Sequence, residues 1–255
     1  MSVFGEYASY YDLFYVQKDY AAESAYVAKL IGSVAPGARS LLDVGCGTGR
    51  HDVKLAEAGF QVHGIDRSAD MLRQARHRLE YAAPAVRDAL HFTMADATCF
   101  DLGIAFDAVV SLFHVVSYLP DDVRLASALA CVRRHLRPGA PFVFDFWHAA
   151  AIEANPPQVV ERCVVEEGRR ILRKTIPTWY RGSETVNVRF VVQIEEGGKV
   201  VHSFAEDHLM RYFSSSEIER HLADSGFRLA RLTEWMSDAP CGPGNFGACA
   251  VAVAR

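Results

Sequence analysis

The stretch Leu41-Leu42-Asp43-Val44-Gly45-Cys46-Gly47-Thr48-Gly49 decides the fold of this chain. An apolar run typical of a buried strand breaks into an acid and then into three alternating glycines. Glycines are needed where the chain turns sharply and where a ligand lies against bare backbone with no Cβ between them. The stretch therefore predicts a strand that ends in a nucleotide-sized binding loop.

The spacing of the glycines distinguishes between ligands. A dinucleotide fingerprint needs its third glycine at position 50, where this chain has Arg50, whereas its glycines stand at 45, 47 and 49. Asp43 adds a carboxylate two residues before the first glycine. Because a carboxylate pairs with an ammonium group, the loop favours a cationic amino acid over a pyrophosphate and disfavours a nicotinamide dehydrogenase.

The rest of the chain extends the strand into an α/β domain. Strand patterns and helix patterns alternate over about 150 residues, as a doubly wound and mostly parallel sheet requires. Asp19 and Ser68 precede two of the helices, and Pro138-Gly139 ends a third. The predicted strands of this part are residues 40–44, 60–65, 90–94, 106–112 and 141–146.

The pattern changes after Trp147. Three runs with strand character, 170–175, 185–195 and 199–212, are separated by glycine-containing turns and predict an antiparallel meander. Ser214 and Glu217 form a capping box for a helix, and strands at 228–234 and 248–254 complete the main sheet. We therefore divide the chain into residues 1–37, a helical lid, residues 38–150 with 214–255, a Rossmann-like domain, and residues 151–213, an antiparallel insertion.

Composition bounds the class of partner. Half of the 255 residues are hydrophobic, which is enough to form one full core. The formal net charge is -4, so the chain lacks the excess of basic residues that binding to nucleic acid or an anionic membrane usually needs. Six scattered cysteines without a Cys-x-x-Cys pair predict reduced thiols rather than a zinc site or a disulfide framework. We expect a cytoplasmic protein with a small-molecule partner and no metal, because the N-terminus also lacks a secretory signal.

Four side chains fall at or just after predicted strand ends, where open α/β sheets bind ligands. Asp43 is placed to hold an ammonium group, and Asp66 is placed to accept hydrogen bonds from both hydroxyls of a ribose. Met71 is placed to pack on an adenine face, and Asp96 is placed to accept from its amino group, with Ala97 beside it. Each residue also has a plain structural explanation, but their coincidence favours a nucleoside site.

On these residues the chain resembles the class I S-adenosylmethionine-dependent methyltransferases, over about residues 38–146. The resemblance implies a seven-stranded sheet, S-adenosylmethionine as cofactor and S-adenosylhomocysteine as product. The residues that it implies for cofactor binding are Tyr15, Tyr20, Asp43, Gly45, Cys46, Gly47, Gly49, Asp66, Arg67, Met71, Asp96, Ala97, Leu112 and Phe113.

A narrower similarity lies outside the glycine loop. The segments 11–15, 18–23, 109–119 and 202–213 resemble the bacterial N-methyltransferases that act on nucleotide-linked amino sugars in the desosamine and mycaminose pathways. That resemblance implies that the insertion forms the acceptor pocket and that the N-terminal tyrosines lie over the cofactor. The basic Gly-Arg-Gly-Leu-Phe segment of those enzymes reads Gly242-Pro243-Gly244-Asn245-Phe246 here, so the arginine expected near a diphosphate is missing.

Methyl transfer from a sulfonium is an in-line displacement, which needs positioning more than it needs a metal or a covalent intermediate. Tyr118, His114 and Tyr15 are the candidate catalytic residues, and Tyr11, Trp147 and His148 are the candidate substrate contacts. Histidines commonly satisfy structural roles instead, and the dense basic run at 169–174 has a solvated strand face as its plainer interpretation.

We therefore expect N-methylation of an amino sugar or a similar polar metabolite. O-methylation of a sugar or natural-product hydroxyl is the alternative, and a catalytically silent cofactor-binding regulator is the alternative from another class. The sequence leaves a monomer and a homodimer both open.

Overall fold

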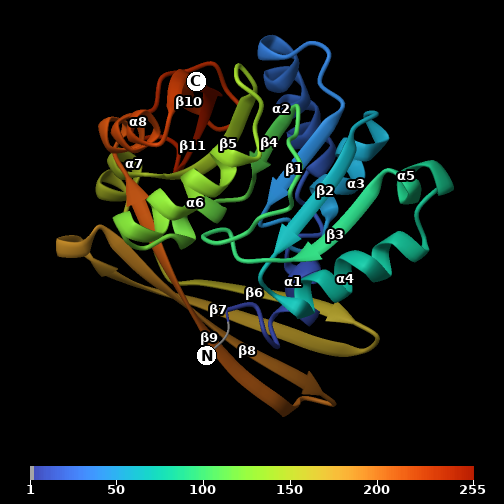
Figure 1. Cartoon of the computed structure of the whole chain (residues 1–255). Coiled ribbons are helices and arrows are strands. Elements are labelled where there is room, and N and C mark those ends of the chain that lie inside the picture. The colour runs from blue at the N-terminus through green and yellow to red at the C-terminus, as the bar shows by residue number, and fades with distance from the viewer. Residues whose placement is uncertain (1–2) are drawn as a thin grey trace.

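The computed structural model describes residues 3–255, which form a doubly wound α/β domain with an antiparallel arm (Figure 1). The main sheet has the order β3-β2-β1-β4-β5-β11-β10, with all neighbours parallel up to β5 and antiparallel beyond it. The order reverses between β1 and β4, where a doubly wound sheet opens a crevice at its carboxyl ends. The predicted fold class is confirmed.

The bounds of the main-sheet strands agree with the sequence pattern to within a few residues. The strands are β1 Ser40–Val44, β2 Gln61–Asp66, β3 Leu90–Met94, β4 Ala108–Ser111, β5 Pro141–His148, β10 Phe227–Glu234 and β11 Gly247–Ala254. The helices between and beside them are α2 Tyr20–Val34, α3 Arg50–Glu57, α4 Ala69–Glu80, α5 Pro84–Asp88, α6 Asp122–Arg134, α7 Ala149–Ala154 and α8 Ser215–Asp224.

Two apolar layers cover the main sheet, one on each face. Val27 and Ile31 of α2 and Leu55 of α3 are fully buried in one layer, while α6 and α8 contribute the other. The predicted caps hold these helices in place, since the side chains of Asp19, Ser68 and Ser214 each accept a hydrogen bond from a first-turn amide. The capping box of Ser214 and Glu217 is also confirmed.

The arm is a four-stranded meander, whereas the sequence predicted three strands. Strands β7 Arg169–Tyr180, β8 Thr185–Glu196 and β9 Lys199–Phe213 extend the predicted runs, and β6 Val160–Glu166 adds an edge strand. The prediction missed β6 because nearly all of its side chains are exposed, so it lacks the alternation that marks a half-buried strand. The end of β9 pairs with Trp147 and His148 of β5, which joins the meander to the main sheet.

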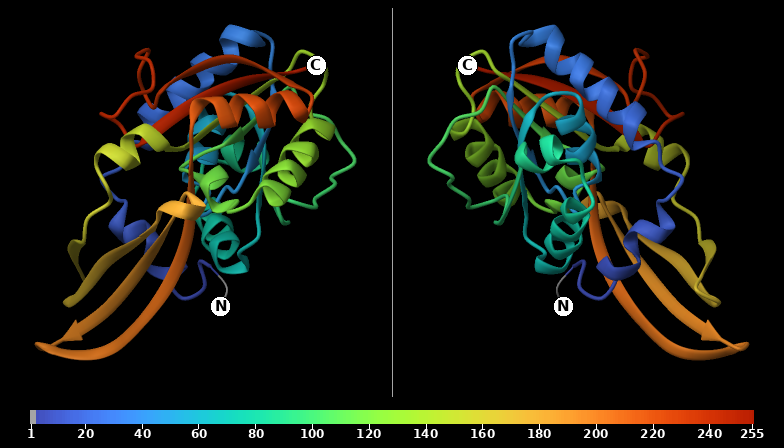
Figure 2. Two further views of the ribbon diagram at one scale, coloured as in Figure 1. Left: turned by 90° about the vertical axis from the view of Figure 1, so that its left-hand side faces the viewer. Right: turned by 90° about the vertical axis from the view of Figure 1, so that its right-hand side faces the viewer.

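The N-terminal segment lies between the main sheet and the meander, as two side views show (Figure 2). Its helix α1 Ala8–Phe14 turns Tyr7 and Phe14 into a cluster with Ile171, Val192 and other apolar residues of the meander. Tyr7 has no exposed surface. The segment therefore closes the space between the two sheets, which is consistent with the predicted lid, and the division into domains stays a prediction.

Candidate functional site

A cavity of about 420 Å³ lies at the carboxyl ends of β1, β2 and β4, under the N-terminal segment and against the meander. Its size falls in the range of about 300 to 1,000 Å³ that is typical of small-molecule sites. The structure brings most of the predicted residues to its wall, namely Tyr11, Tyr15, Tyr20, Asp43, Gly45, Cys46, Gly47, Asp66, Arg67, Met71, Asp96, Ala97, Leu112, Phe113, His114, Tyr118 and Trp147.

Two predicted residues do not line the cavity. Gly49 caps α3 with a φ of +71°, and a Cβ there would lie 2.8 Å from a ring carbon of Phe92, so its role is conformational. His148 turns away at the end of β5, and its Nε2 lies 3.1 Å from the hydroxyl of Ser215. Burial lowers the pKa of His148, in keeping with a neutral structural histidine.

The glycine loop is held close to the neighbouring strand. The amides of Gly45 and Cys46 both donate to the carbonyl of Ile65, and Gly45 adopts a φ of +87°. A Cβ on Gly45 would lie 2.5 Å from a methyl carbon of Val115, which leaves no room for a side chain. Gly45 is therefore required for close packing of the loop against Val115, and Gly45 and Gly47 both line the cavity.

Asp66 organises the loop and still has free acceptor capacity. Its Oδ2 accepts from the Gly47 amide at 2.9 Å, and its Oδ1 accepts from the Ser68 amide at 2.8 Å. Burial raises the pKa of this carboxyl, while the amide hydrogen bonds oppose that shift. An ionised carboxylate offers about four lone-pair sites, so two remain for the hydroxyls of a ribose.

We predict that Asp66→Ala weakens binding of S-adenosylhomocysteine by about 10-fold or more, since charge-assisted hydrogen bonds to the ribose are lost. Isothermal titration calorimetry measures the affinity, and Asp70→Asn on the exposed first turn of α4 is the matched control. Equal affinities of the wild type and Asp66→Ala would remove Asp66 from the cofactor site.

Asp43 and Asp52 form a buried carboxyl pair behind the glycine loop. Asp43 is 2% exposed and Asp52 is fully buried. Within residues 3–255, no protein donor reaches either oxygen of Asp52 or Oδ1 of Asp43. Burial and the neighbouring Asp52 raise the pKa of Asp43, and burial raises the pKa of Asp52 to about 7. Asp43 also lines the cavity, with Oδ1 left for a ligand ammonium.

The opposite end of the cavity suits a flat apolar group with one polar edge. Met71 is buried at this end. Oδ1 of Asp96 accepts hydrogen bonds from the amide and the hydroxyl of Thr98. Although burial raises the pKa of Asp96, the hydrogen bonds from Thr98 outweigh it and lower that pKa. Its Oδ2 lies 3.8 Å from Arg124 and retains lone pairs for an amino group.

Aromatic rings from the N-terminal segment cover the middle of the cavity. Tyr15 packs against Tyr11 and edge-on against Phe113, with ring centroids 4.7 and 5.1 Å apart. Arg173 of the meander is 5% exposed and donates to the hydroxyls of Tyr7 and Tyr15. The plainer interpretation of the basic run at 169–174 is a solvated strand face. For Arg173 that interpretation is wrong, because its side chain is buried. It holds the tyrosines in position.

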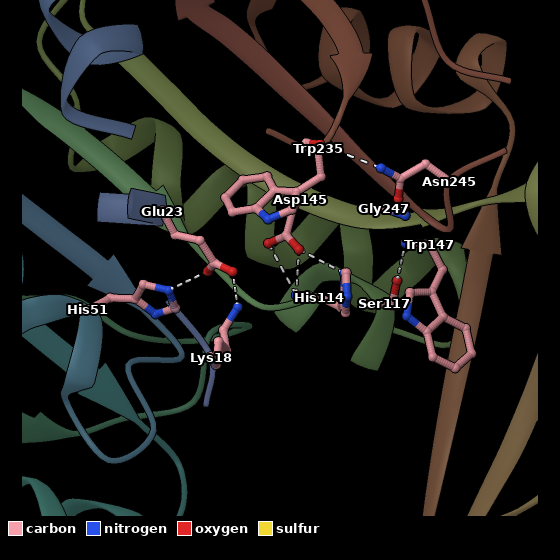
Figure 3. Close-up of polar contacts among 10 residues, drawn as sticks. All are labelled: Lys18, Glu23, His51, His114, Ser117, Asp145, Trp147, Trp235, Asn245 and Gly247. Carbon is pink, nitrogen blue, oxygen red and sulfur yellow. Dashed lines mark hydrogen bonds and ion pairs between the residues drawn. The ribbon is translucent and has the colours of Figure 1, made fainter. Parts of the chain in front are cut away.

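His114 is oriented by a buried acid at the carboxyl end of β5. Its Nδ1 lies 2.7 Å from Oδ2 of Asp145, whose carboxylate also accepts from the His114 amide and is 1% exposed (Figure 3). The backbone of His114 has a φ of +65°, an uncommon conformation that directs the ring toward Asp145. The contact lacks hydrogen-bond geometry, but the nearby carboxylate favours the hydrogen on Nδ1, which leaves Nε2 as the acceptor.

Figure 3 also shows a second oriented histidine at the glycine-loop end of the cavity. The Nε2 of His51 lies 2.8 Å from Glu23, which also pairs with Lys18. Arg50 stands beside it, with its guanidinium 4.7 Å from the ring centroid of Tyr20. Arg50 and His51 both line the cavity, so this end offers a guanidinium and an imidazole to a ligand carboxylate.

The structure brings in a third histidine, to which spacing alone assigned no role. His208 of β9 is fully buried, and its Nδ1 lies 3.0 Å from the hydroxyl of Tyr118. Tyr118 ends the short 3-10 helix η1 Val115–Tyr118, which follows β4. The signal in the sequence was the alternation along β9, because residues two apart in a strand face the same side. Glu206, His208 and Met210 are buried while Asp207 and Leu209 are exposed.

Residues 3–255 also lack the features of two other kinds of site. No helix in that range is long and apolar enough to cross a membrane. No group of three or more histidine, cysteine, aspartate or glutamate side chains is arranged to hold a metal ion there.

Comparison with known proteins adds to this geometry. A family model described as "Methyltransferase domain" matches residues 41–139. The dTDP-3-amino-3,4,6-trideoxy-alpha-D-glucopyranose N,N-dimethyltransferase of Streptomyces venezuelae is 35% identical over 243 residues, which cover 94% of this chain and 96% of that protein.

Solved structures agree over the whole chain. The sugar N-methyltransferase KedS8 from Streptoalloteichus sp is 29% identical with a TM-score of 0.81, and the match covers 100% of this chain and 97% of that one. CalS10, an amino pentose methyltransferase from Micromonospora echinaspora solved with S-adenosylmethionine bound, is 27% identical with a TM-score of 0.74 and coverages of 100% and 99%.

Proposed function

Because the chain belongs to the S-adenosylmethionine-dependent methyltransferase family that includes the dTDP-amino-sugar N,N-dimethyltransferases, we propose that its acceptor is the amine of an amino sugar. The observation that carries the proposal is the 35% identity to such an enzyme over 94% of this chain. A match over that much of the chain includes the glycine loop and most of the meander, both of which line the cavity.

The residues around the cavity fit the cofactor. The bare backbone at Gly45, the free oxygen of Asp43 and the spare lone pairs of Asp66 match an amino acid joined to a ribose. We propose that Arg50 and His51 face the carboxylate of the methionine part. When bound, the sulfonium of S-adenosylmethionine supplies the methyl group for an in-line displacement.

We propose that Tyr15, His114 and Tyr118 contact the reacting atoms, with Tyr11 and Trp147 along the acceptor. Tyr15 is held by Arg173 over Phe113. The amide of Trp147 donates to the Ser117 hydroxyl at 2.9 Å, which sets the indole at the cavity wall (Figure 3). His114, with Asp145 on Nδ1, presents Nε2 to a hydrogen-bond donor of the acceptor.

The chemistry favours nitrogen over oxygen as the nucleophile. A neutral amine attacks a methyl group directly after losing one proton, whereas a hydroxyl must be deprotonated as it reacts and needs stronger base assistance. The histidines at the cavity are bases of moderate strength. They suffice for an ammonium group.

The test is a methylation assay with S-adenosylmethionine and dTDP-3-amino-3,6-dideoxyglucose, followed by mass spectrometry. We expect the mass of one and then two methyl groups on the sugar nitrogen. The matched control is the same nucleotide sugar with a hydroxyl in place of the amine, which should stay unmodified. Methylation of that hydroxyl would overturn the proposal. So would a lack of methylation of both nucleotide sugars and of a panel of free amino sugars.

A separate prediction concerns the lid. Asp12 of α1 accepts from the Thr48 hydroxyl at 2.9 Å and pairs with Arg78, which ties the N-terminal segment to the glycine loop. We expect Asp12→Ala to speed the dissociation of S-adenosylhomocysteine about 5-fold or more, since a partly buried charged pair contributes about 1 kcal/mol or more. Stopped-flow displacement measures the rate. An unchanged dissociation rate would contradict a role of the N-terminal segment as a lid. The control is Asp19→Ala, which removes only the cap of α2.

A further inference from the structure

We propose that Tyr118, His208 and Glu206 form a relay that takes the proton from the acceptor amine and delivers it to His208. In this relay Tyr118 touches the amine, and His208 and Glu206 act through Tyr118. The inference rests on the proposed function for the identity of the amine. The relay joins the loop after β4 to the meander, so it exists only in the folded chain.

The two ring nitrogens of His208 face different groups, and these groups decide which nitrogen carries the hydrogen. Oε2 of Glu206 lies 3.6 Å from Nε2 of His208, and the Tyr118 hydroxyl lies 3.0 Å from Nδ1 on the other side of the ring. At 3.6 Å the carboxylate forms no hydrogen bond with Nε2, but its negative charge favours the hydrogen on that nitrogen. We therefore assign the hydrogen to Nε2, so that Nδ1 accepts from the Tyr118 hydroxyl. The lone pairs of the Tyr118 oxygen are then free for a donor in the cavity.

The charge of Glu206 is secured by the N-terminal segment. The amides of Phe4 and Tyr7 donate to its two oxygens at 3.0 and 2.9 Å. Burial raises the pKa of Glu206, but the contact with His208 and the hydrogen bonds from Tyr7 and Phe4 outweigh it and bring that pKa below its ordinary value. Glu206 therefore stays ionised and stabilises a positive charge on His208.

Tyr118 passes the proton on to His208 and does not end in a different protonation state. Burial raises its pKa well above the ordinary value, so it keeps a proton at neutral pH. The proton of the substrate ammonium moves to the Tyr118 oxygen as the Tyr118 hydroxyl proton moves to Nδ1 of His208. The amine is left neutral, Tyr118 again carries one proton, and the imidazolium faces Glu206. Rotation about the C–N bond then turns the nitrogen lone pair from Tyr118 to the methyl group. The proton leaves to solvent when the site opens.

The surroundings of His208 explain why the relay needs the closed state. The ring is enclosed by Phe4, Tyr7 and Phe190, at centroid distances of 4.8, 6.1 and 4.8 Å. Among the ionisable groups around the imidazole, Glu206 and Tyr118 are its direct neighbours. Arg173 lies farther away and donates a hydrogen bond to the hydroxyl of Tyr7. Because Phe4 and Tyr7 belong to the N-terminal segment, docking of that segment both buries His208 and binds Glu206.

The test is His208→Asn, whose side-chain oxygen can accept from Tyr118 but takes no proton. We expect kcat for the amino sugar at pH 7 to fall about 100-fold, the usual contribution of general acid-base catalysis, with S-adenosylhomocysteine affinity unchanged within about 2-fold. The loss should shrink as pH rises, since the amine then arrives neutral. His77→Asn on the exposed face of α4 is the matched control.

Two further variants keep the test independent of folding. Tyr118→Phe preserves the ring and should show the same loss and the same recovery with pH. Glu206→Gln keeps the shape but not the charge. Because a positive charge on His208 is then less stable, this variant should also lower kcat at pH 7, and the loss should again shrink as pH rises.

A parallel fall in cofactor affinity, an unchanged kcat, or a loss independent of pH would overturn the relay. The wild type is assayed first on nitrogen and oxygen acceptors. Methylation of oxygen by the wild type would refute the proposed acceptor, and the His208→Asn effect on that reaction would still test the relay.

Discussion

Gly45→Ala is expected to weaken the binding of S-adenosylhomocysteine by about 100-fold or more. The new Cβ would lie 2.5 and 2.6 Å from the two methyl carbons of Val115, on a backbone with a φ of +87°. A strained conformation of this kind costs about 1 to 3 kcal/mol by itself, and the overlap forces the loop or η1 to move. Because η1 also carries Tyr118, kcat should fall with the affinity.

The matched control for this prediction is Gly59→Ala. Gly59 has a φ of +98°, but a Cβ there meets nothing within 4 Å, so it carries the backbone cost without the overlap. Calorimetry should find wild-type affinity in this control. Val115→Ala added to Gly45→Ala removes the methyl groups and should restore part of the affinity. Full affinity in Gly45→Ala alone would show that the loop does not lie against the cofactor.

Asp52→Asn is expected to stabilise the protein without cofactor at pH 8 by about 2 to 4 kcal/mol and to change little at pH 4. Burial, the largest cause, raises the pKa of Asp52 in the folded state from 3.8 to about 7. A raised folded pKa means that the native state holds the proton more tightly, so this contribution is complete below about pH 4 and is lost as pH rises through 7. Asparagine is neutral throughout and removes the loss.

Urea unfolding at pH 4, 6 and 8 measures this prediction. The wild type should lose free energy of unfolding between pH 4 and 8 relative to Asp52→Asn, and the exposed substitution Asp224→Asn should follow the wild type. Parallel curves for wild type and Asp52→Asn would mean that Asp52 is ionised without penalty in the native state. The raised pKa of Asp52 would then be refuted.

The residues near the glycine loop were predictable because their constraints are local. A positive φ at Gly45 and Gly47 restricts those positions whatever the rest of the chain does. The acids Asp43 and Asp66 follow directly after or within short apolar strands, and parallel strands bring their carboxyl ends to one edge. The pattern therefore predicted which side chains meet at the cofactor end of the cavity.

The same reasoning failed where contacts depend on docking between distant segments. Arg173 reads as part of a charged strand, yet it is buried because α1 packs over the meander. His148 stands next to Trp147 in the sequence, yet alternation along β5 turns it toward Ser215 and out of the cavity.

By itself the sequence determined the α/β fold, the loop from Asp43 to Gly49 and the acids beside it, because strand periodicity and glycine conformations are short-range properties. Only the tertiary structure decided that His208 reaches the cavity with Glu206 behind it, and that Gly49 and His148 do not line the cavity. Those outcomes depend on which face of each strand turns inward when the meander docks. That choice is made by burial of apolar surface between segments far apart in the sequence, as the stacking of Tyr7 on Phe190 of the meander shows.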